Sequence, residues 1–123
     1  MKSTDLLITL TGDKREENNV TIAFTMALTA KKKGLDTDLL ILSYGTYLME
    51  KGYAEQVDIG EPFEPVKKLM DEYLALGGKI SVCNACLKHN GIDVENLVDG
   101  LDIVDAEYVV DALMAAEKTL QLN

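Results

Sequence analysis

Two cysteines, Cys83 and Cys86, are the residues of this 123-residue sequence whose type and spacing point to chemistry. They follow the apolar run Lys79 to Val82, which has the composition of a short buried strand, and they precede a segment that can begin a helix. Amides of a first helical turn have no intrahelical partners and lie at the positive end of the helix dipole. A thiol held there ionises more readily, so Cys83 is the principal candidate for a nucleophile.

Three kinds of chemistry fit a Cys-x-x-Cys pair at this place in the chain. The first is persulfide or thiol transfer, in which Cys83 accepts a sulfane sulfur and Cys86 resolves or protects it. The second is dithiol-disulfide exchange, although here the pair follows the third predicted strand and no proline faces it. The third is a metal site with His89 as a further ligand, which needs a fourth group to complete a tetrahedral zinc centre. Packing of both cysteines in the core is the alternative without chemistry.

Residues that follow the other predicted strands are expected to line the same site. The carboxyl ends of parallel strands meet along one edge of a sheet, where α/β proteins hold their ligands. The predicted rim comprises Gly12 and Asp13 after the first strand, Tyr44 after the second and Asn84 after the third. Gly12 and Gly45 match neither the dinucleotide-binding nor the Walker pattern. We therefore expect no cofactor, and a metal remains as the alternative.

The composition argues against several classes of partner. Twelve lysine and arginine residues face 21 aspartate and glutamate residues, a net charge of -9, and the one basic run is Lys31 to Lys33 at a predicted helix end. We therefore expect no binding to nucleic acid or to anionic membranes. No cleavable leader or membrane span is visible, and two cysteines are too few for a disulfide framework. These features favour a cytoplasmic protein with free thiols.

Hydrophobic periodicity predicts a single α/β domain over residues 1–123. Strands and helices alternate along the chain, with Asp13 or a neighbour as the cap of the first helix and Asp105 as the cap of the last. This alternation predicts a mostly parallel sheet of four or five strands with helices on both faces. The predicted strands are Asp5 to Leu10, Thr37 to Leu42, Lys79 to Val82, Leu101 to Val104 and, at the sheet edge, Thr119 to Leu122; the principal predicted helices end at Lys33, Leu76, His89 and Glu117.

We also expect the chain to associate with itself. A small sheet of this kind has an edge to cover. Tyr47, Leu48 and Met49 lie in a segment that looks too short to bury them alone. The sequence thus predicts a homo-oligomer.

The segment from Ile80 to Ile92 resembles the DsrE/DsrF-like family, which includes TusD-type sulfur-relay subunits. Members share a strand, a cysteine, a short helix and then a glycine eight residues after the cysteine, a pattern that Cys83 and Gly91 match. The likeness extends over nearly the full chain. It implies a DsrE-like domain with flavodoxin-like layering that assembles into trimers or hexamers. In the relay members it also implies a persulfide on the cysteine that matches Cys83.

Two functions from different classes follow. The first is a sulfur-carrier or sulfurtransferase-like protein, with Cys83 as persulfide acceptor, Cys86 as secondary thiol, and other proteins as sulfur donor and acceptor. The second is a non-catalytic oligomeric binding or regulatory module whose Cys-x-x-Cys is structural or binds a metal. Accessibility of the Cys83 sulfur to reagents separates the two.

Overall fold

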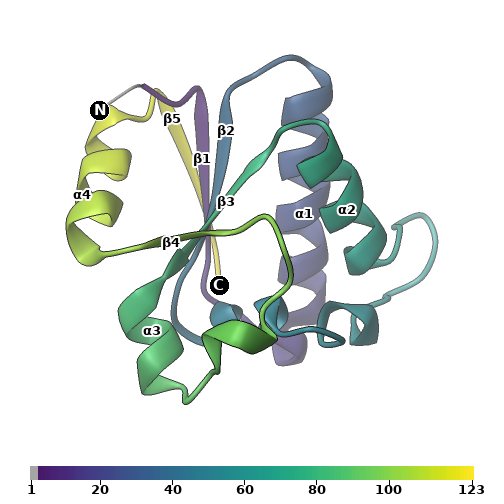
Figure 1. Ribbon diagram of the computed structural model, residues 1–123. Helices are drawn as coiled ribbons and strands as arrows, with labels where there is room; N and C mark the ends of the chain where they lie inside the picture. Colours follow the sequence, from purple (N-terminus) through teal and green to yellow (C-terminus); the bar gives the residue numbers. More distant parts are fainter. Residues whose placement is uncertain (1–2) are drawn as a thin grey trace.

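The computed structural model describes residues 3–123, which form a five-stranded parallel sheet between two layers of helices (Figure 1). The strand order is β4-β3-β2-β1-β5, and each neighbouring pair is parallel, as the alternation of elements predicted. The strands are β1 (Leu6–Leu10), β2 (Thr37–Ile41), β3 (Lys79–Cys83), β4 (Asp102–Val104) and β5 (Lys118–Leu122). The helices are α1 (Glu17–Lys32), α2 (Val66–Ala75), α3 (Asn84–His89) and α4 (Ala106–Ala115).

The two faces of the sheet are covered unequally. On one face α1 and α2 pack side by side and form the main core, in which Phe24, Met70 and Tyr73 are fully buried. On the other face α4 forms a much smaller cluster, with Ala112 packed against Leu7 and Leu40. Helix α4 therefore makes fewer apolar contacts with the sheet than α1 or α2. Since apolar burial is the main source of stability, α4 is held less firmly by packing.

Local side-chain hydrogen bonds cap α4 and the short turn that precedes α1. Asp105 caps α4 by accepting a hydrogen bond from the backbone N–H of Tyr108, as predicted. Asp13 instead caps a single 3-10 turn, Lys14–Glu16, through the N–H of Arg15. This turn precedes α1, whose own first residue has no side-chain cap. The chain thus enters α1 one turn later than the capping pattern predicted.

The segment from Tyr47 to Met49 packs against the core, so the prediction that it exposes apolar side chains is wrong. It belongs to the 3-10 helical segment Ser43–Met49, called here the Ser43 turn, in which Leu48 and Met49 are fully buried. The later segment around Leu97 and Val98 folds over it, through a bridge from Glu50 to Leu97 and a hydrogen bond from the N–H of Val98 to the carbonyl of Met49. Cover from this distant segment is what the local sequence could not reveal.

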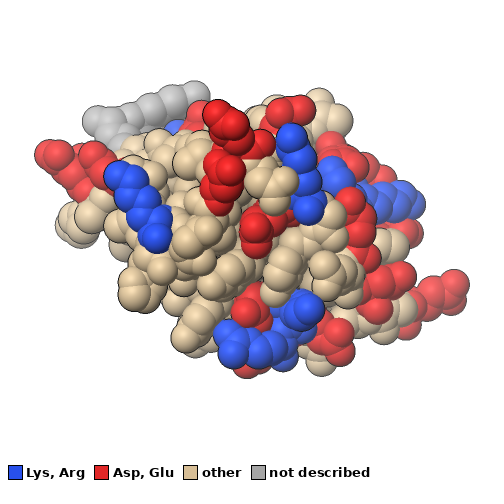
Figure 2. Space-filling model, turned by 60° about the horizontal axis from the view of Figure 1, so that its bottom comes forward, with Lys and Arg blue, Asp and Glu red and all other residues tan. Residues whose placement is uncertain are grey.

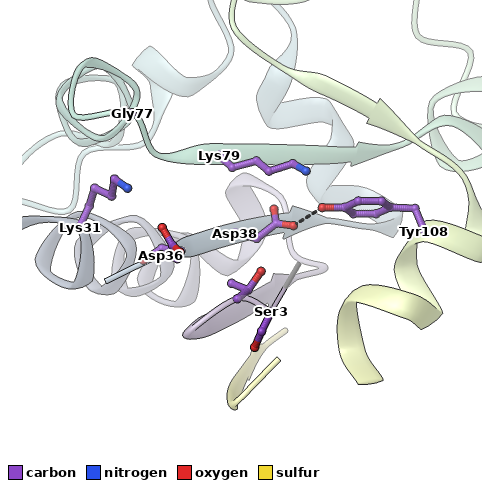
Figure 3. A pocket seen from close by; sticks show the side chains of 9 residues that line it. Ser3, Lys31, Asp36, Asp38, Gly77, Lys79 and Tyr108 are labelled. Atoms are coloured by element: carbon purple, nitrogen blue, oxygen red, sulfur yellow. Dashed lines mark hydrogen bonds between the residues drawn. The ribbon is translucent and has the colours of Figure 1, made fainter. Parts of the chain in front are cut away.

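A buried carboxylate fastens α4 to the sheet. Asp38 of β2 is 2% exposed, and its two oxygens accept hydrogen bonds from the Ser81 hydroxyl at 2.8 Å and the Tyr108 hydroxyl at 2.6 Å. The Lys79 ammonium lies 4.6 Å from the centre of the Tyr108 ring. Figure 3 shows Asp38, Lys79 and Tyr108 at a cavity of about 330 Å³, near the amino ends of the strands. A hydrogen bond to a charged group is strong, so this contact compensates for the small apolar cluster under α4.

Replacing Tyr108 with Phe should therefore destabilise the protein and loosen α4. The buried Asp38 carboxylate would lose one of its two donors, and we expect the free energy of unfolding to fall by about 1–3 kcal/mol. Urea denaturation measures the loss, and amide hydrogen exchange should quicken in α4 before α1. Tyr44→Phe is the matched control, because Tyr44 is exposed and water can replace its hydroxyl contacts. Equal losses in both variants would contradict this role for Asp38.

Candidate functional site

The carboxyl ends of the strands meet at the lower edge of the molecule in Figure 1, where α3 begins. Cys83 is the last residue of β3 and the N-cap of α3, and Cys86 lies within that six-residue helix. The Ser43 turn follows β2 and packs against α3. Neighbouring strands thus deliver the thiols and the Ser43 turn to one edge, as the parallel sheet predicted.

The two thiols differ in their access to solvent. Neither cysteine is in a disulfide; Cys83 is only 8% exposed, whereas Cys86 is half-buried. The sequence predicted an accessible sulfur at Cys83, and this prediction is wrong. Cys83 is still part of β3, where it pairs with Val104 of β4, and this pairing keeps it inside the sheet layer. Cys86 is one helical turn farther out, so the pair has an inner and an outer sulfur.

Cys86 is contacted from both sides. The backbone N–H of Ser43 donates a hydrogen bond to Cys86 Sγ over 3.2 Å. Burial raises the pKa of the Cys86 thiol above its ordinary value, and a hydrogen bond with Cys83 raises it further, while the Ser43 N–H acts in the opposite direction. Cys86 therefore holds its proton more tightly than a free cysteine.

A hollow of about 390 Å³ opens beside the outer sulfur. It is lined by Ser43, Tyr44, Ala85, Cys86, His89 and Asn90, whereas Cys83 and Asn84 do not line it. Figure 2 brings the lower side of the molecule forward and shows uncharged side chains over much of that face, with acidic and basic groups around them. The hollow gives a small group or an extended thiol access to Cys86.

The predicted rim residues of the first strand lie in an adjoining hollow. Gly12 and Asp13 line a space of about 360 Å³ that shares Tyr44 with the thiol hollow. The Arg15 guanidinium lies 4.7 Å from the centre of the Tyr44 ring, and its Nε is 3.0 Å from an Asp13 carboxylate oxygen. Burial alone would raise the pKa of Asp13, but the hydrogen bonds and charge of Arg15 outweigh it and lower that pKa. Asp13 is thus an ionised partner of Arg15, beside the thiols but not facing them.

Asn90 is a residue of the site that sequence reasoning did not select, and its partner is Ser43, which follows β2. Ser43 has a φ of 55°, a left-handed conformation that is uncommon for any residue except glycine. The Asn90 amide donates to the Ser43 carbonyl at 3.0 Å and to the Thr46 hydroxyl at 2.9 Å. The sequence placed Ser43 at the carboxyl end of a strand and so at the same edge as the cysteines, but no local pattern connects it with Asn90.

One signal near Ser43 was present in the sequence. Gly45 follows the strand closely, and a Cβ added there would lie 2.8 Å from the Leu10 carbonyl oxygen and 3.1 Å from an Ile41 methyl group. Only glycine allows this close approach, so its position indicates a tight turn against β1.

The predicted three-ligand metal set does not come together within one chain. Over residues 3–123, no group of three or more histidine, cysteine, aspartate or glutamate side chains is arranged to hold a metal ion. His89 lines the thiol hollow but makes no ligand set with the two cysteines. Over the same residues, no helix has the length and apolar character needed to cross a membrane.

Comparisons with solved structures show the same fold. The chain superposes on the ychN protein of E. coli with a TM-score of 0.80 at 18% identity, covering 99% of this chain and 100% of that one. It superposes on protein MTH1491 of Methanobacterium thermoautotrophicum, described as of unknown function, with a TM-score of 0.70 at 15% identity, covering 94% and 98% of the two chains. At these identities the likeness establishes the fold alone.

Sequence comparison gives a relative and a family. The uncharacterized protein MJ0989 of Methanocaldococcus jannaschii is 31% identical over 78 residues, which cover 63% of this chain and 64% of that protein's length. The model of the DsrE/DsrF-like family matches residues 5–122, and this confirms the family resemblance predicted from the sequence. Because the family model matches nearly its whole length, the chain belongs to the DsrE/DsrF-like family.

Proposed function

We propose that this protein is a sulfur carrier, with sulfurtransferase-like activity, that accepts a sulfane sulfur as a persulfide on Cys83 and passes it to a thiol of a partner protein. The observation that carries the proposal is the pair of interacting free thiols at the carboxyl edge of the sheet, with one of them lining an open hollow. Membership of the DsrE/DsrF-like family is consistent with sulfur relay.

The proton distribution in the pair supports Cys83 as the nucleophile. Burial and the hydrogen bond with Cys83 raise the pKa of Cys86, so Cys86 is the thiol that keeps its proton. The proposal therefore assigns the attack to the other thiol of the pair, Cys83. Since the thiolate is the reactive form, the inner cysteine attacks and the outer one assists.

The transfer consists of two balanced exchanges. The Cys83 thiolate attacks the outer sulfur of a persulfide on a donor protein; a sulfur-sulfur bond forms on Cys83, the donor's sulfur-sulfur bond breaks, and the donor leaves as a thiolate. A thiolate of the acceptor protein then attacks the outer sulfur of the Cys83 persulfide. Cys83 is released as a thiolate, and no net oxidation or reduction occurs. The hollow lined by Cys86 is the approach to the pair in this proposal, and Cys83 lies behind Cys86 rather than in the lining.

Persulfide loading tests this assignment. After incubation with a cysteine desulfurase and cysteine, we expect the wild-type protein to gain the mass of one sulfur atom on the peptide that contains Cys83. Cys83→Ser should abolish the gain, whereas Cys86→Ser should retain it at a lower rate. Intact-protein and peptide mass spectrometry measure the loading, with an established sulfur carrier as the positive control. A wild-type protein that stays unmodified while the control loads would favour the non-catalytic module instead.

Alkylation of Cys86 tests the proton distribution separately. The hydrogen bond with Cys83 helps to raise the pKa of Cys86, so removing it with Cys83→Ala should lower that pKa. At pH 8 we expect iodoacetamide to modify Cys86 about two- to tenfold faster than in the wild type, since one pKa unit changes the thiolate fraction up to tenfold. Denatured protein gives the reference rate. An unchanged or slower rate in the variant would show that burial alone governs Cys86.

The outward side of α4 supports the predicted self-association. Val110, Leu113 and Met114 share one side of the helix and are 58%, 38% and 82% exposed. A cluster of exposed apolar side chains on a helix commonly marks a surface that another protein covers. We therefore propose that copies of this chain meet at α4 in a trimer or hexamer. The contact surface is then α4 and not the segment from Tyr47 to Met49.

Met114→Glu should weaken this assembly. A carboxylate in an apolar interface loses its hydration without gaining a partner, and we expect dissociation to occur at concentrations at least tenfold higher than for the wild type. Sedimentation velocity over a micromolar concentration range measures the shift. Met26→Glu, at an exposed position of α1, is the matched control. A wild-type protein that sediments as a monomer throughout this range would contradict the proposal.

A further inference from the structure

Asn90 connects the end of α3 with the Ser43 turn. Its side-chain amide donates to the Ser43 carbonyl at 3.0 Å and to the Thr46 hydroxyl at 2.9 Å, and the Thr46 hydroxyl donates to the same Ser43 carbonyl at 2.9 Å. Thr46 is fully buried, and Asn90 is half-buried. The three groups form a closed set of hydrogen bonds around one peptide unit, called here the Ser43 clamp.

The clamp holds an unfavourable backbone conformation. Ser43 has a left-handed φ of 55°, which side chains other than glycine adopt only when their surroundings impose it. In this conformation the Ser43 N–H points to Cys86 Sγ at 3.2 Å while its carbonyl faces Asn90 and Thr46. The N–H of Ser43 thus contacts the Cys86 thiol, while its carbonyl is held by the clamp. Loss of the clamp would therefore change the direction of the N–H.

We propose that Asn90 is a positioning residue for the thiol pair: through the Ser43 clamp it aims the Ser43 N–H at Cys86 Sγ. This inference rests on the proposed function, since it assigns Asn90 a part in the thiol chemistry. The N–H is a fixed donor to the outer sulfur, so it stabilises negative charge on Cys86 whenever that thiol is ionised. Asn90 acts through Ser43 and does not itself contact a sulfur in the hydrogen-bond network.

Few other groups compete with this N–H. The titratable side chains that surround Cys86 are Cys83 at the end of β3, His89 on α3 and Tyr44 in the Ser43 turn. Among the described residues that line the hollow, none is lysine, arginine, aspartate or glutamate. The backbone donor from Ser43 is therefore the one polar contact that favours the charged form of Cys86 in this arrangement.

Asn90→Ala tests the proposal through the pH profile of Cys86 alkylation, followed by mass spectrometry of the Cys86 peptide. Loss of the aimed N–H should move the midpoint of the profile to higher pH and lower the rate at pH 8 about three- to tenfold. If Asn90 had a purely structural role, its substitution would loosen the turn without raising the midpoint of the profile. Only the plateau rate at high pH, which reports the access of the reagent to Cys86, would then change. A midpoint that is unchanged or lower in Asn90→Ala overturns the proposal.

Three further variants give the controls. Asn96→Ala removes the same side chain from an exposed 3-10 turn nearby and should keep the wild-type midpoint. Thr46→Ser keeps the hydroxyl and should also keep it, whereas Thr46→Val should raise it as Asn90→Ala does. Thermal denaturation establishes that each variant is folded. Because alkylation needs no sulfur donor, a raised midpoint together with failed persulfide loading would reject the proposed function alone, and the reverse result would reject only the role of Asn90.

Discussion

The parallel register of β2 against β3 is the constraint on which the site depends. Ile41 pairs with Val82, so the residues that follow the two strands leave the sheet side by side and in the same direction. Cys83 and α3 continue from one strand, and Ser43 and its turn continue from the other. A shift of one residue in this register would turn the Ser43 N–H away from Cys86 Sγ and place buried side chains on the wrong face.

The same strand also fixes the opposite end of the molecule. Near the start of β2, Asp38 binds Ser81 and Tyr108, and this charged contact holds α4 where little apolar surface is buried. On the other face, α1 and α2 are held by a large apolar core. One face is thus stabilised by buried apolar area and the other by a specific polar contact. Helix α4 in addition exposes apolar side chains on its outer side.

Burial gives the two cysteines different parts in the proposed chemistry. Cys83 lies within the sheet layer, while Cys86 lines the hollow and keeps its proton because burial and its hydrogen bond with Cys83 raise its pKa. In the proposed chemistry, the buried position of Cys83 keeps a persulfide on it away from bulk solvent between exchanges. The arrangement depends on the helix that follows β3, because Cys83 is the N-cap of α3 and Cys86 lies in its first turn.

The sequence by itself determined the order of elements, the parallel sheet and the edge at which the cysteines lie. The unbroken apolar strands, the cap at Asp105 and the glycine after α3 are local patterns, and each acts within a few residues of the chain. Only the tertiary structure decided which sulfur is open, how Leu48 and Met49 are covered, and that Asn90 holds Ser43. These depend on contacts such as Asn90 with Ser43 and Met49 with Val98, between residues more than forty positions apart, whose partners no local periodicity identifies.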